Sequence, residues 1–354
     1  MSVTGDSIRI RRFLANTHWN VNRRMDVSVL QRCWFLTGPT ASGKSAVAME
    51  LADRIQAEII SLDSMTIYRG MDIGTAKPTA SERQRIPHHL IDIADPHEEF
   101  SVAEFVARAA KVAAEIVDRG RSPLFVGGTG LYLRSLLRGL SSGPDADWPF
   151  RKQLELESAE RGPLWLHSQL AECDPVTAAR LSPNDRRRII RALEVFHLSG
   201  SPISASQHHA PRPSSERPVV VLWLDPPRPW LCERINRRVD EMIDHGWLLE
   251  TQTLLSYQPA PSRTALQALG YRELIAVLRN EIPLAAAVGQ IKTSTRQFAK
   301  RQKTWFRNLE ECISLPISGT ESPCEIAESI IARAATAGSP VETVPAPSTA
   351  SRSV

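Results

Sequence analysis

Short apolar runs alternate with amphipathic stretches over most of the chain. Residues 33–37, 58–63, 123–127 and 219–225 each form an apolar run of strand length, which predicts four buried strands. Residues 46–55 place apolar side chains at helical spacing, and Ser101 with Glu104 predicts a capping box for a helix ending at Gly120. This alternation predicts an α/β fold, in which helices flank a parallel sheet that binds ligands at the carboxyl ends of its strands.

Strand patterns stop between residues 143 and 210, where charged helical stretches take their place. We interpret residues 143–210 as a helical insertion. Residues 29–142 and 211–337 then form one α/β core that finishes with C-terminal helices, the longest predicted over residues 284–308.

The two ends of the chain differ in composition from the core. Residues 1–24 hold five arginines, one acid and no apolar stretch of signal-peptide length, so we expect a flexible leader over residues 1–28. A basic targeting segment is the alternative. The fold is expected to begin with a strand near Met25, which is also a candidate start of translation. Residues 338–354 are dominated by Pro, Ser, Thr and Ala, which predicts a disordered tail.

Composition excludes some classes of protein. Hydrophobic residues make up 42% of the chain, yet no apolar run reaches the roughly 18 residues that span a bilayer, so we expect no membrane anchor. The five cysteines contain no C-x-x-C pair, which argues against a disulfide framework or a thiolate zinc site and favours the cytoplasm. The net charge of +4 is small for a chain of this length, and it would indicate a polyanionic partner only if it were concentrated on one surface. We expect the protein to be a monomer.

A phosphate-binding loop follows the first predicted strand and precedes an amphipathic helix. The segment matches G-x-x-x-x-G-K-[ST] at Gly38, Pro39, Thr40, Ala41, Ser42, Gly43, Lys44 and Ser45. Its backbone N–H groups and Lys44 suit a phosphate chain, and the Ser45 hydroxyl suits Mg²⁺, the expected cofactor. The loop predicts a P-loop NTPase-like sheet but not the ligand, because a kinase and a diphosphate-consuming transferase would share it.

Asp63 ends the second predicted strand. By position alone it could be a magnesium-shell carboxylate, a general base or a capping residue. The sequence from Asp63 to Pro78, DSMTIYRGMDIGTAKP, closely resembles a signature of the tRNA dimethylallyltransferase family. Six more blocks in the same order resemble that family: GPTASGKS from 38, PHHLID from 87, VGGTGLY from 126, PND from 183 with RALEV from 191, GYRE from 270, and TRQFAKRQ from 295 with WFR from 305. Thr66 departs from the pattern, since the family often has Gln there.

The resemblance implies a reaction and assigns roles. Members transfer a dimethylallyl group from dimethylallyl diphosphate to N6 of the adenine on the 3′ side of the anticodon in tRNA. By resemblance Asp63 is the general base, Thr129 meets the substrate adenine and Arg238 binds the pyrophosphate. A carboxylate is suited to this base role. The adenine amino group is a poor nucleophile because its lone pair is delocalised into the ring, so a group that receives its proton helps the bond to form. Without the family pattern, Arg238 would be interpreted as a solvated helix arginine and Thr129 as a turn residue that caps the next helix.

A basic stretch near the end of the core predicts contact with nucleic acid. Residues 291–307 hold six Lys or Arg residues and no acid, and Lys292, Arg296, Lys300, Lys303 and Arg307 would line one helix face. A solvated basic face is the alternative. A second basic cluster, residues 186–188 with Arg191, lies in the helical insertion. The resemblance implies that the partner is tRNA, bound by its anticodon stem-loop. The residues that it implies for tRNA binding are Asp63, Ser64, Met65, Thr66, Arg187, Arg188, Ile189, Ile190, Arg191, Gln267, Ala268, Leu269, Gly270, Tyr271, Arg272, Lys300, Arg301, Lys303 and Arg307.

Three other functions are compatible with parts of the sequence. A P-loop kinase would consume ATP, and a relative that prenylates free adenine nucleotides would have little use for two basic surfaces. A non-catalytic tRNA-binding protein is disfavoured by the intact Lys44, Ser45 and Asp63. A transferase acting on tRNA would have to extrude the adenine from its stack to reach a recessed diphosphate. His88 and His89 are interpreted as structural, because no other ligand-type residues accompany them at metal spacing.

Overall fold

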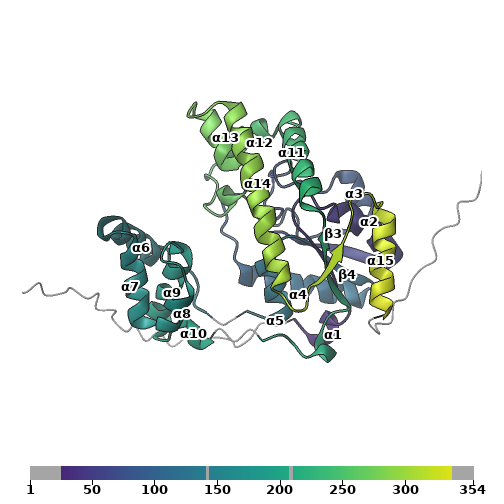
Figure 1. Ribbon diagram of the computed structural model, residues 1–354, viewed down its shortest axis with the longest axis horizontal. Coiled ribbons are helices and arrows are strands. Elements are labelled where there is room, and N and C mark those ends of the chain that lie inside the picture. Colours follow the sequence, from purple (N-terminus) through teal and green to yellow (C-terminus); the bar gives the residue numbers. More distant parts are fainter. Residues whose placement is uncertain (1–24, 141–142, 207–209, 337–354) are drawn as a thin grey trace, which may run out of the picture. The chain divides into compact units, whose positions relative to one another are not determined.

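The computed structural model describes residues 25–140, 143–206 and 210–336 (Figure 1). The chain forms two compact units, an insertion unit over residues 139–210 and a core unit built from the flanking segments on both sides. The insertion unit thus begins at residue 139, four residues earlier than the pattern of strands predicted. Residues 1–24 and 337–354, which carry most of the expected leader and tail, lie outside the described residues.

The core unit is organised around one parallel sheet, as the sequence predicted. Its strands lie in the order β3-β2-β4-β1-β5-β6. They are β1 (Trp34–Thr37), β2 (Ala57–Leu62), β3 (His88–His89), β4 (Ser122–Gly127), β5 (Val220–Asp225) and β6 (Ile313–Pro316). The central strand β1 is buried throughout, with Trp34 in register with Leu124 on one side and Val220 on the other. The two edge strands were not predicted, because β3 has two residues and β6 has four with an exposed Ile313.

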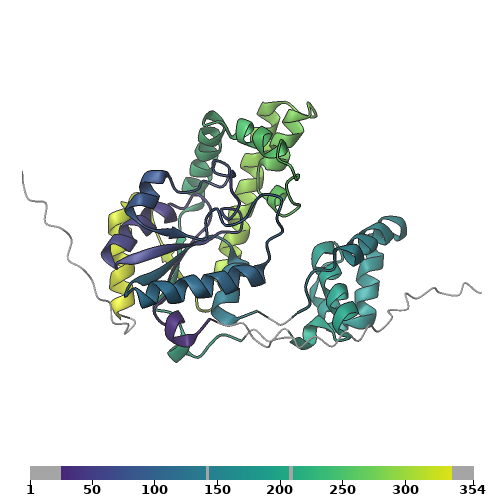
Figure 2. The ribbon, with the colours of Figure 1, turned by 180° about the vertical axis from the view of Figure 1, so that it is seen from behind.

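Helices cover both faces of this sheet because its strands are apolar on both sides. The core-unit helices are α1 (Val27–Leu30), α2 (Lys44–Arg54), α3 (Ala80–Arg85), α4 (Val102–Asp118), α5 (Gly130–Arg138), η1 (Ser214–Glu216), α11 (Arg228–Asp244), α12 (Trp247–Leu255), η2 (Ala265–Gln267), α13 (Tyr271–Leu278), α14 (Leu284–Arg307) and α15 (Pro323–Thr336). Helix α4 packs against β2 and β4 (Figure 2).

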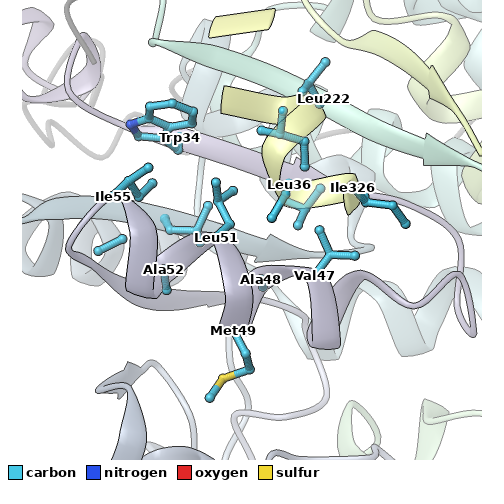
Figure 3. Close-up of a cluster of buried hydrophobic side chains, with 14 of the residues drawn as sticks. Trp34, Leu36, Val47, Ala48, Met49, Leu51, Ala52, Ile55, Leu222 and Ile326 are labelled. Atoms are coloured by element: carbon cyan, nitrogen blue, oxygen red, sulfur yellow. The ribbon is translucent and has the colours of Figure 1, made fainter. Parts of the chain in front are cut away.

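The hydrophobic core between the sheet and α2 and α15 fixes the position of the loop after β1. Leu36 and Leu222 of the sheet meet Val47 and Leu51 of α2, and Ile326 of α15 closes the cluster (Figure 3). Successive side chains of a strand point to opposite faces, so Phe35 and Phe125 stack on the other face, with ring centroids 4.6 Å apart. Both ends of the loop are therefore anchored in packed structure.

Two local predictions at helix starts are wrong. Residues 25–28 do not belong to a flexible leader, and no strand begins there, because Met25 is buried and Asp26 caps α1 by accepting from Ser28 N at 2.8 Å. The capping box at α4 is half formed. Ser101 Oγ accepts from Glu104 N at 3.1 Å, but the Glu104 carboxylate pairs with Arg108 on the next turn instead of returning to the backbone.

Arg212 links the two segments of the core unit that flank the insertion unit. Its guanidinium is buried and donates to Leu137 O at 3.1 Å and to Met25 O at 2.9 Å. Leu137 lies in the last turn of α5, before the insertion unit, and Arg212 follows it. The two segments are thus held together within the core unit.

The insertion unit is helical, with its own hydrophobic core. Its helices are α6 (Trp148–Arg161), α7 (Pro163–Cys173), α8 (Pro175–Arg180), α9 (Arg186–Ser199) and α10 (Ile203–Ser206). The Glu194 side chain is fully buried, and it accepts from Arg151 Nε at 2.7 Å and Arg191 Nη1 at 2.5 Å. Burial opposes its ionisation, but these hydrogen bonds hold the pKa of Glu194 below its ordinary value.

No helix among the described residues is long and apolar enough to cross a membrane.

Leu51→Ala is expected to lower the free energy of unfolding of the protein by about 2–5 kcal/mol, because it leaves a cavity between α2 and the sheet. Leu249→Ala is the matched control. That leucine is 66% exposed on α12, so its loss should change stability by about 0.5 kcal/mol or less. Chemical denaturation followed by tryptophan fluorescence measures both, and equal destabilisation by the two variants would contradict the packing described here.

Candidate active site

Residues 38–43 connect β1 to α2 at the carboxyl end of the sheet, and Lys44 and Ser45 begin α2. Gly43 has a φ of 91°, a left-handed conformation that favours glycine, and α2 begins at the next residue. The first N–H groups of α2 have no partner within the helix and point toward the loop. Ser45 is exposed in the first turn. The geometry is that of an anion-binding helix N-terminus.

Lys44 is held close to the loop by a hydrogen bond from Nζ to Pro39 O at 3.4 Å. Burial opposes its positive charge and the Arg238 guanidinium repels it, which together lower the pKa of Lys44 to about 8, although Asp63 acts in the opposite direction. Lys44, Arg238 and Asp63 are therefore close enough for their charges to act on one another.

Two arginines on one face of α11 complete the positive side of the site. Arg234 Nε donates to Ala41 O at 3.0 Å, and its guanidinium lies 4.6 Å from the centre of the Trp230 ring. Arg238, one turn later, makes no hydrogen bond or ion pair among the described residues. Burial lowers its pKa, against the pull of Asp63. A half-buried cation without a partner beside a phosphate-binding loop is available to an anion.

Asp63 follows the last residue of β2, at the same carboxyl edge of the sheet as the loop, and β4 lies between β2 and β1. Its Oδ1 accepts from Met65 N at 2.9 Å, which holds the carboxylate in a tight turn. The neighbouring strand β4 leads to Thr129, whose N–H donates to Leu62 O and whose hydroxyl accepts from Ser64 N, both at 3.2 Å. The Thr129 hydroxyl thus supports the turn that carries Asp63, and the structure brings the two predicted residues together.

The segment after Asp63 is held by two polar groups that our sequence reasoning did not single out. The Lys77 side chain is buried, and its Nζ donates to Tyr68 O at 2.5 Å and to the carboxylates of Asp72 and Asp92 at 2.7 and 2.5 Å. The Glu250 carboxylate of α12 accepts from three successive N–H groups, those of residues 72–74, at 2.7, 2.7 and 3.0 Å. Lys77 lies in the segment from Asp63 to Pro78 that resembles the family signature, whereas no sequence pattern around Glu250 indicates its role.

The predicted tRNA-binding residues range from exposed to buried, and six are half-buried: Asp63, Ser64, Met65, Arg191, Leu269 and Lys303. The exposed ones are Arg187, Arg188, Gln267, Arg272, Lys300, Arg301 and Arg307. Five others are at most 7% exposed, so their side chains are covered in this structure: Thr66, Ile189, Ile190, Ala268 and Tyr271. Gly270 is buried as well. Ile189 and Ile190 fill the core of the insertion unit, and Tyr271 OH donates to Glu250 at 2.7 Å. These residues instead support the elements that carry their exposed neighbours.

The basic stripe on α14 is also narrower than predicted. Lys292 pairs with Asp240 at 2.6 Å and Lys303 with Asp225 at 2.5 Å, while Arg296 donates to Asn236 at 2.6 Å. The partners come from β5 and α11, far away in the sequence. The exposed cations of α14 that remain, Lys300, Arg301 and Arg307, define what we call the α14 basic surface.

The histidines of β3 have structural contacts. His89 Nε2 pairs with Glu58 at 2.6 Å, and His88 Nδ1 lies 2.7 Å from Ile86 O. No group of three or more His, Cys, Asp or Glu side chains gathers as a metal site in the part of the chain that the structure describes.

The parallel sheet, the loop between β1 and α2 and the carboxylate at the end of β2 define an α/β enzyme of the P-loop class. Comparison with known proteins specifies the family. A family model described as IPP transferase matches residues 66–309, and one described as isopentenyl transferase matches residues 31–95. The chain belongs to the tRNA dimethylallyltransferase family.

Individual relatives support this assignment over most of their length. The tRNA dimethylallyltransferase of Symbiobacterium thermophilum is 49% identical over 84% of this chain and 92% of its own, and that of Geobacter metallireducens is 47% identical over 81% and 93%. The crystal structure of the tRNA isopentenylpyrophosphate transferase from Bacillus halodurans is similar with a TM-score of 0.62 and 38% identity, covering 87% of this chain and 98% of that one. A eukaryotic dimethylallyltransferase captured acting on tRNA gives a TM-score of 0.71 at 29% identity, covering 89% and 82%.

The pKa of Lys44 predicts how pyrophosphate binding depends on pH. A bound anion favours charged Lys44, so above about pH 8 the free protein must take up a proton to bind, and affinity should fall. Between pH 7 and 9 the dissociation constant of wild type should rise about tenfold more than that of Lys44→Arg, whose side chain stays charged. Titration calorimetry with inorganic pyrophosphate measures both proteins and cancels the titration of the ligand. Parallel pH profiles would contradict a titrating Lys44.

Proposed function

We propose that this protein transfers a dimethylallyl group from dimethylallyl diphosphate to N6 of the adenine on the 3′ side of the anticodon in tRNA. Membership of the tRNA dimethylallyltransferase family supports the reaction. The observation that carries the proposal is the placement of the Asp63 carboxylate near two half-buried cations, Lys44 at the phosphate-binding loop and Arg238 on α11. Such a site can remove a proton and stabilise a departing anion at once.

The proposed step forms one bond and breaks one. The lone pair of N6 forms a bond to C1 of the dimethylallyl group while the bond between C1 and the diphosphate oxygen breaks. Asp63 accepts the proton that N6 loses, so the prenylated adenine leaves neutral. The charge that develops on the diphosphate is stabilised by the loop N–H groups, Lys44 and Arg238.

Mg²⁺ fits the loop side of this site. A Ser hydroxyl is an oxygen ligand suited to Mg²⁺, which binds few protein ligands and otherwise takes phosphate oxygens and water. We propose that Ser45, which is exposed at the start of α2, holds the ion against the diphosphate. When bound, the ion would neutralise part of the charge of the leaving group.

Recognition of the acceptor is proposed to use both units. Phosphate groups of the anticodon stem-loop would contact the α14 basic surface and the exposed Arg187 and Arg188 of α9. The target adenine would leave its stack and reach Asp63 and Thr129. All of these residues lie on one chain, and we propose a monomer that acts in the cytoplasm.

Transfer of radiolabelled dimethylallyl from its diphosphate to unmodified tRNA tests the reaction. Asp63→Asn should reduce the rate of transfer by about 10²–10⁴-fold, because it removes the base and keeps the shape. Asp118→Asn, at an exposed acid at the end of α4, is the control and should retain full activity.

Parallel reactions with AMP as acceptor and with ATP distinguish the alternatives. Label in AMP alone would favour an enzyme of free nucleotides, and consumption of ATP without transfer would favour a kinase. Either result would reject the tRNA assignment while leaving the phosphate-binding loop intact.

Salt dependence tests the narrowed basic surface. Replacing both Lys300 and Arg307 by Ala should reduce the slope of log affinity for tRNA against log salt by about 1.4–1.8, since each phosphate contact contributes about 0.7–0.9. Lys292→Ala should leave the slope nearly unchanged, because Lys292 is paired with Asp240. Filter binding over a range of salt concentrations measures both. A larger effect at Lys292 would show that the surface has been assigned wrongly.

A further inference from the structure

Gln302 lies on the inner face of α14 and uses both ends of its amide within the site. Its side chain is buried, with the residue 6% exposed. Oε1 accepts from Thr40 N at 2.8 Å, and Nε2 donates to Gly128 O at 2.9 Å. At 6% exposure the side chain is covered by protein, and each of its polar atoms already has a protein partner, so contact with RNA does not explain its position among basic residues.

The two partners of Gln302 belong to opposite sides of the reaction. Thr40 lies in the diphosphate loop. Gly128 precedes Thr129, whose N–H and hydroxyl contact Leu62 and Ser64, the two neighbours of Asp63. A continuous series of hydrogen bonds therefore runs from the loop through Gln302 to the turn that holds the carboxylate.

Close packing around Gln302 leaves little room for adjustment. A Cβ atom on Gly128 would lie 2.2 Å from Nε2 of Gln302, and one on Gly130 would lie 2.9 Å from the ring of Trp305 on the same helix. One turn earlier in α14, Ala299 packs with Ala41 of the loop. The spacing between the loop and the Gly128–Gly130 segment is thus set by one face of α14.

We propose that Gln302 is a positioning residue that fixes the separation between the diphosphate loop and the Thr129–Asp63 pair. The inference rests on the proposed transfer reaction. In that reaction the C–O bond breaks at the loop while N6 loses its proton at Asp63, so both groups must be correctly placed around one reacting carbon. A misplacement of about 1 Å in such a site costs about 100-fold in rate.

Only a side chain with a donor and an acceptor at this length can hold both partners. Methionine has nearly the same shape and lacks both functions. Ionised glutamate keeps the acceptor toward Thr40 N but cannot donate to Gly128 O, whereas protonated glutamate can do both. Comparing these variants therefore separates the hydrogen-bonding role of Gln302 from its contribution to packing.

The test compares Gln302→Met with Gln297→Met, a control on the exposed side of α14. Gln302→Met is expected to lower kcat about 100-fold while KM for tRNA stays within about twofold, because the α14 basic surface is unchanged. Gln297→Met should retain wild-type kcat. An unchanged kcat in Gln302→Met would overturn the inference, and so would a loss confined to KM.

Gln302→Glu supplies a readout that packing alone does not move. Its rate relative to wild type should rise as the pH is lowered from 8 to 6, because burial raises the pKa of a glutamate and the protonated form restores the missing donor. The ratio to wild type cancels any pH dependence that the two proteins share. A flat or falling ratio would overturn the inference.

A double-mutant cycle keeps the test informative if Gln302→Met folds poorly. Gly128→Ala, which pushes the Gln302 amide away, should lower kcat in the same way, and combining it with Gln302→Glu should add little further loss. Multiplicative losses would reject a shared role. Failure of the wild-type protein to prenylate tRNA would reject the proposed function instead, so the two failures are distinguishable.

Discussion

The site depends on a balance of charge in which two cations and one carboxylate lie near one another without forming a salt bridge. Lys44 and Arg238 repel each other and are both opposed by burial, while Asp63 attracts both. A direct salt bridge to either cation would stabilise the ionised carboxylate and make Asp63 a weaker base. Three separate elements, β2, α2 and α11, hold the groups apart, and the parallel sheet brings the ends of those elements to one edge.

Much of this arrangement could be predicted because it is encoded over short distances in the sequence. The loop from Gly38 to Ser45 carries its own spacing, and an apolar strand before it and a helix after it fix where it lies. Asp63 was found by its place at the end of a strand, and its neighbour Thr129 follows the next strand of the sheet. Parallel strands place their carboxyl ends together whatever their separation in the chain, so local pattern locates the site. The roles of Asp63, Thr129 and Arg238 came from the family resemblance.

What could not be predicted depends on pairs of residues that are distant in sequence. The basic stripe of α14 looked uniform until Asp225, Asn236 and Asp240 were found to neutralise or occupy part of it. Ile189 and Ile190 follow the exposed Arg187 and Arg188 on α9, yet the helix turns them inward. Gln302 and Glu250 act through backbone groups, whose positions no side-chain pattern records. The edge strands β3 and β6 are too short for a periodic signal.

The two hydrogen bonds of the Arg212 guanidinium, to Leu137 O and Met25 O, bear on how the protein folds and how its sequence can change in evolution. Arg212 follows the insertion unit and is hydrogen-bonded to the end of α5, which precedes it. Residues 139–210 are therefore inserted between two points of the core unit that are held close together. The hydrogen bonds of the sheet do not pass through the insertion unit, and the entropy of closing a loop grows only slowly with its length. The helical unit can therefore lengthen, shorten or be exchanged among relatives with little cost to the sheet, as is usual for domains inserted where chain ends lie close together.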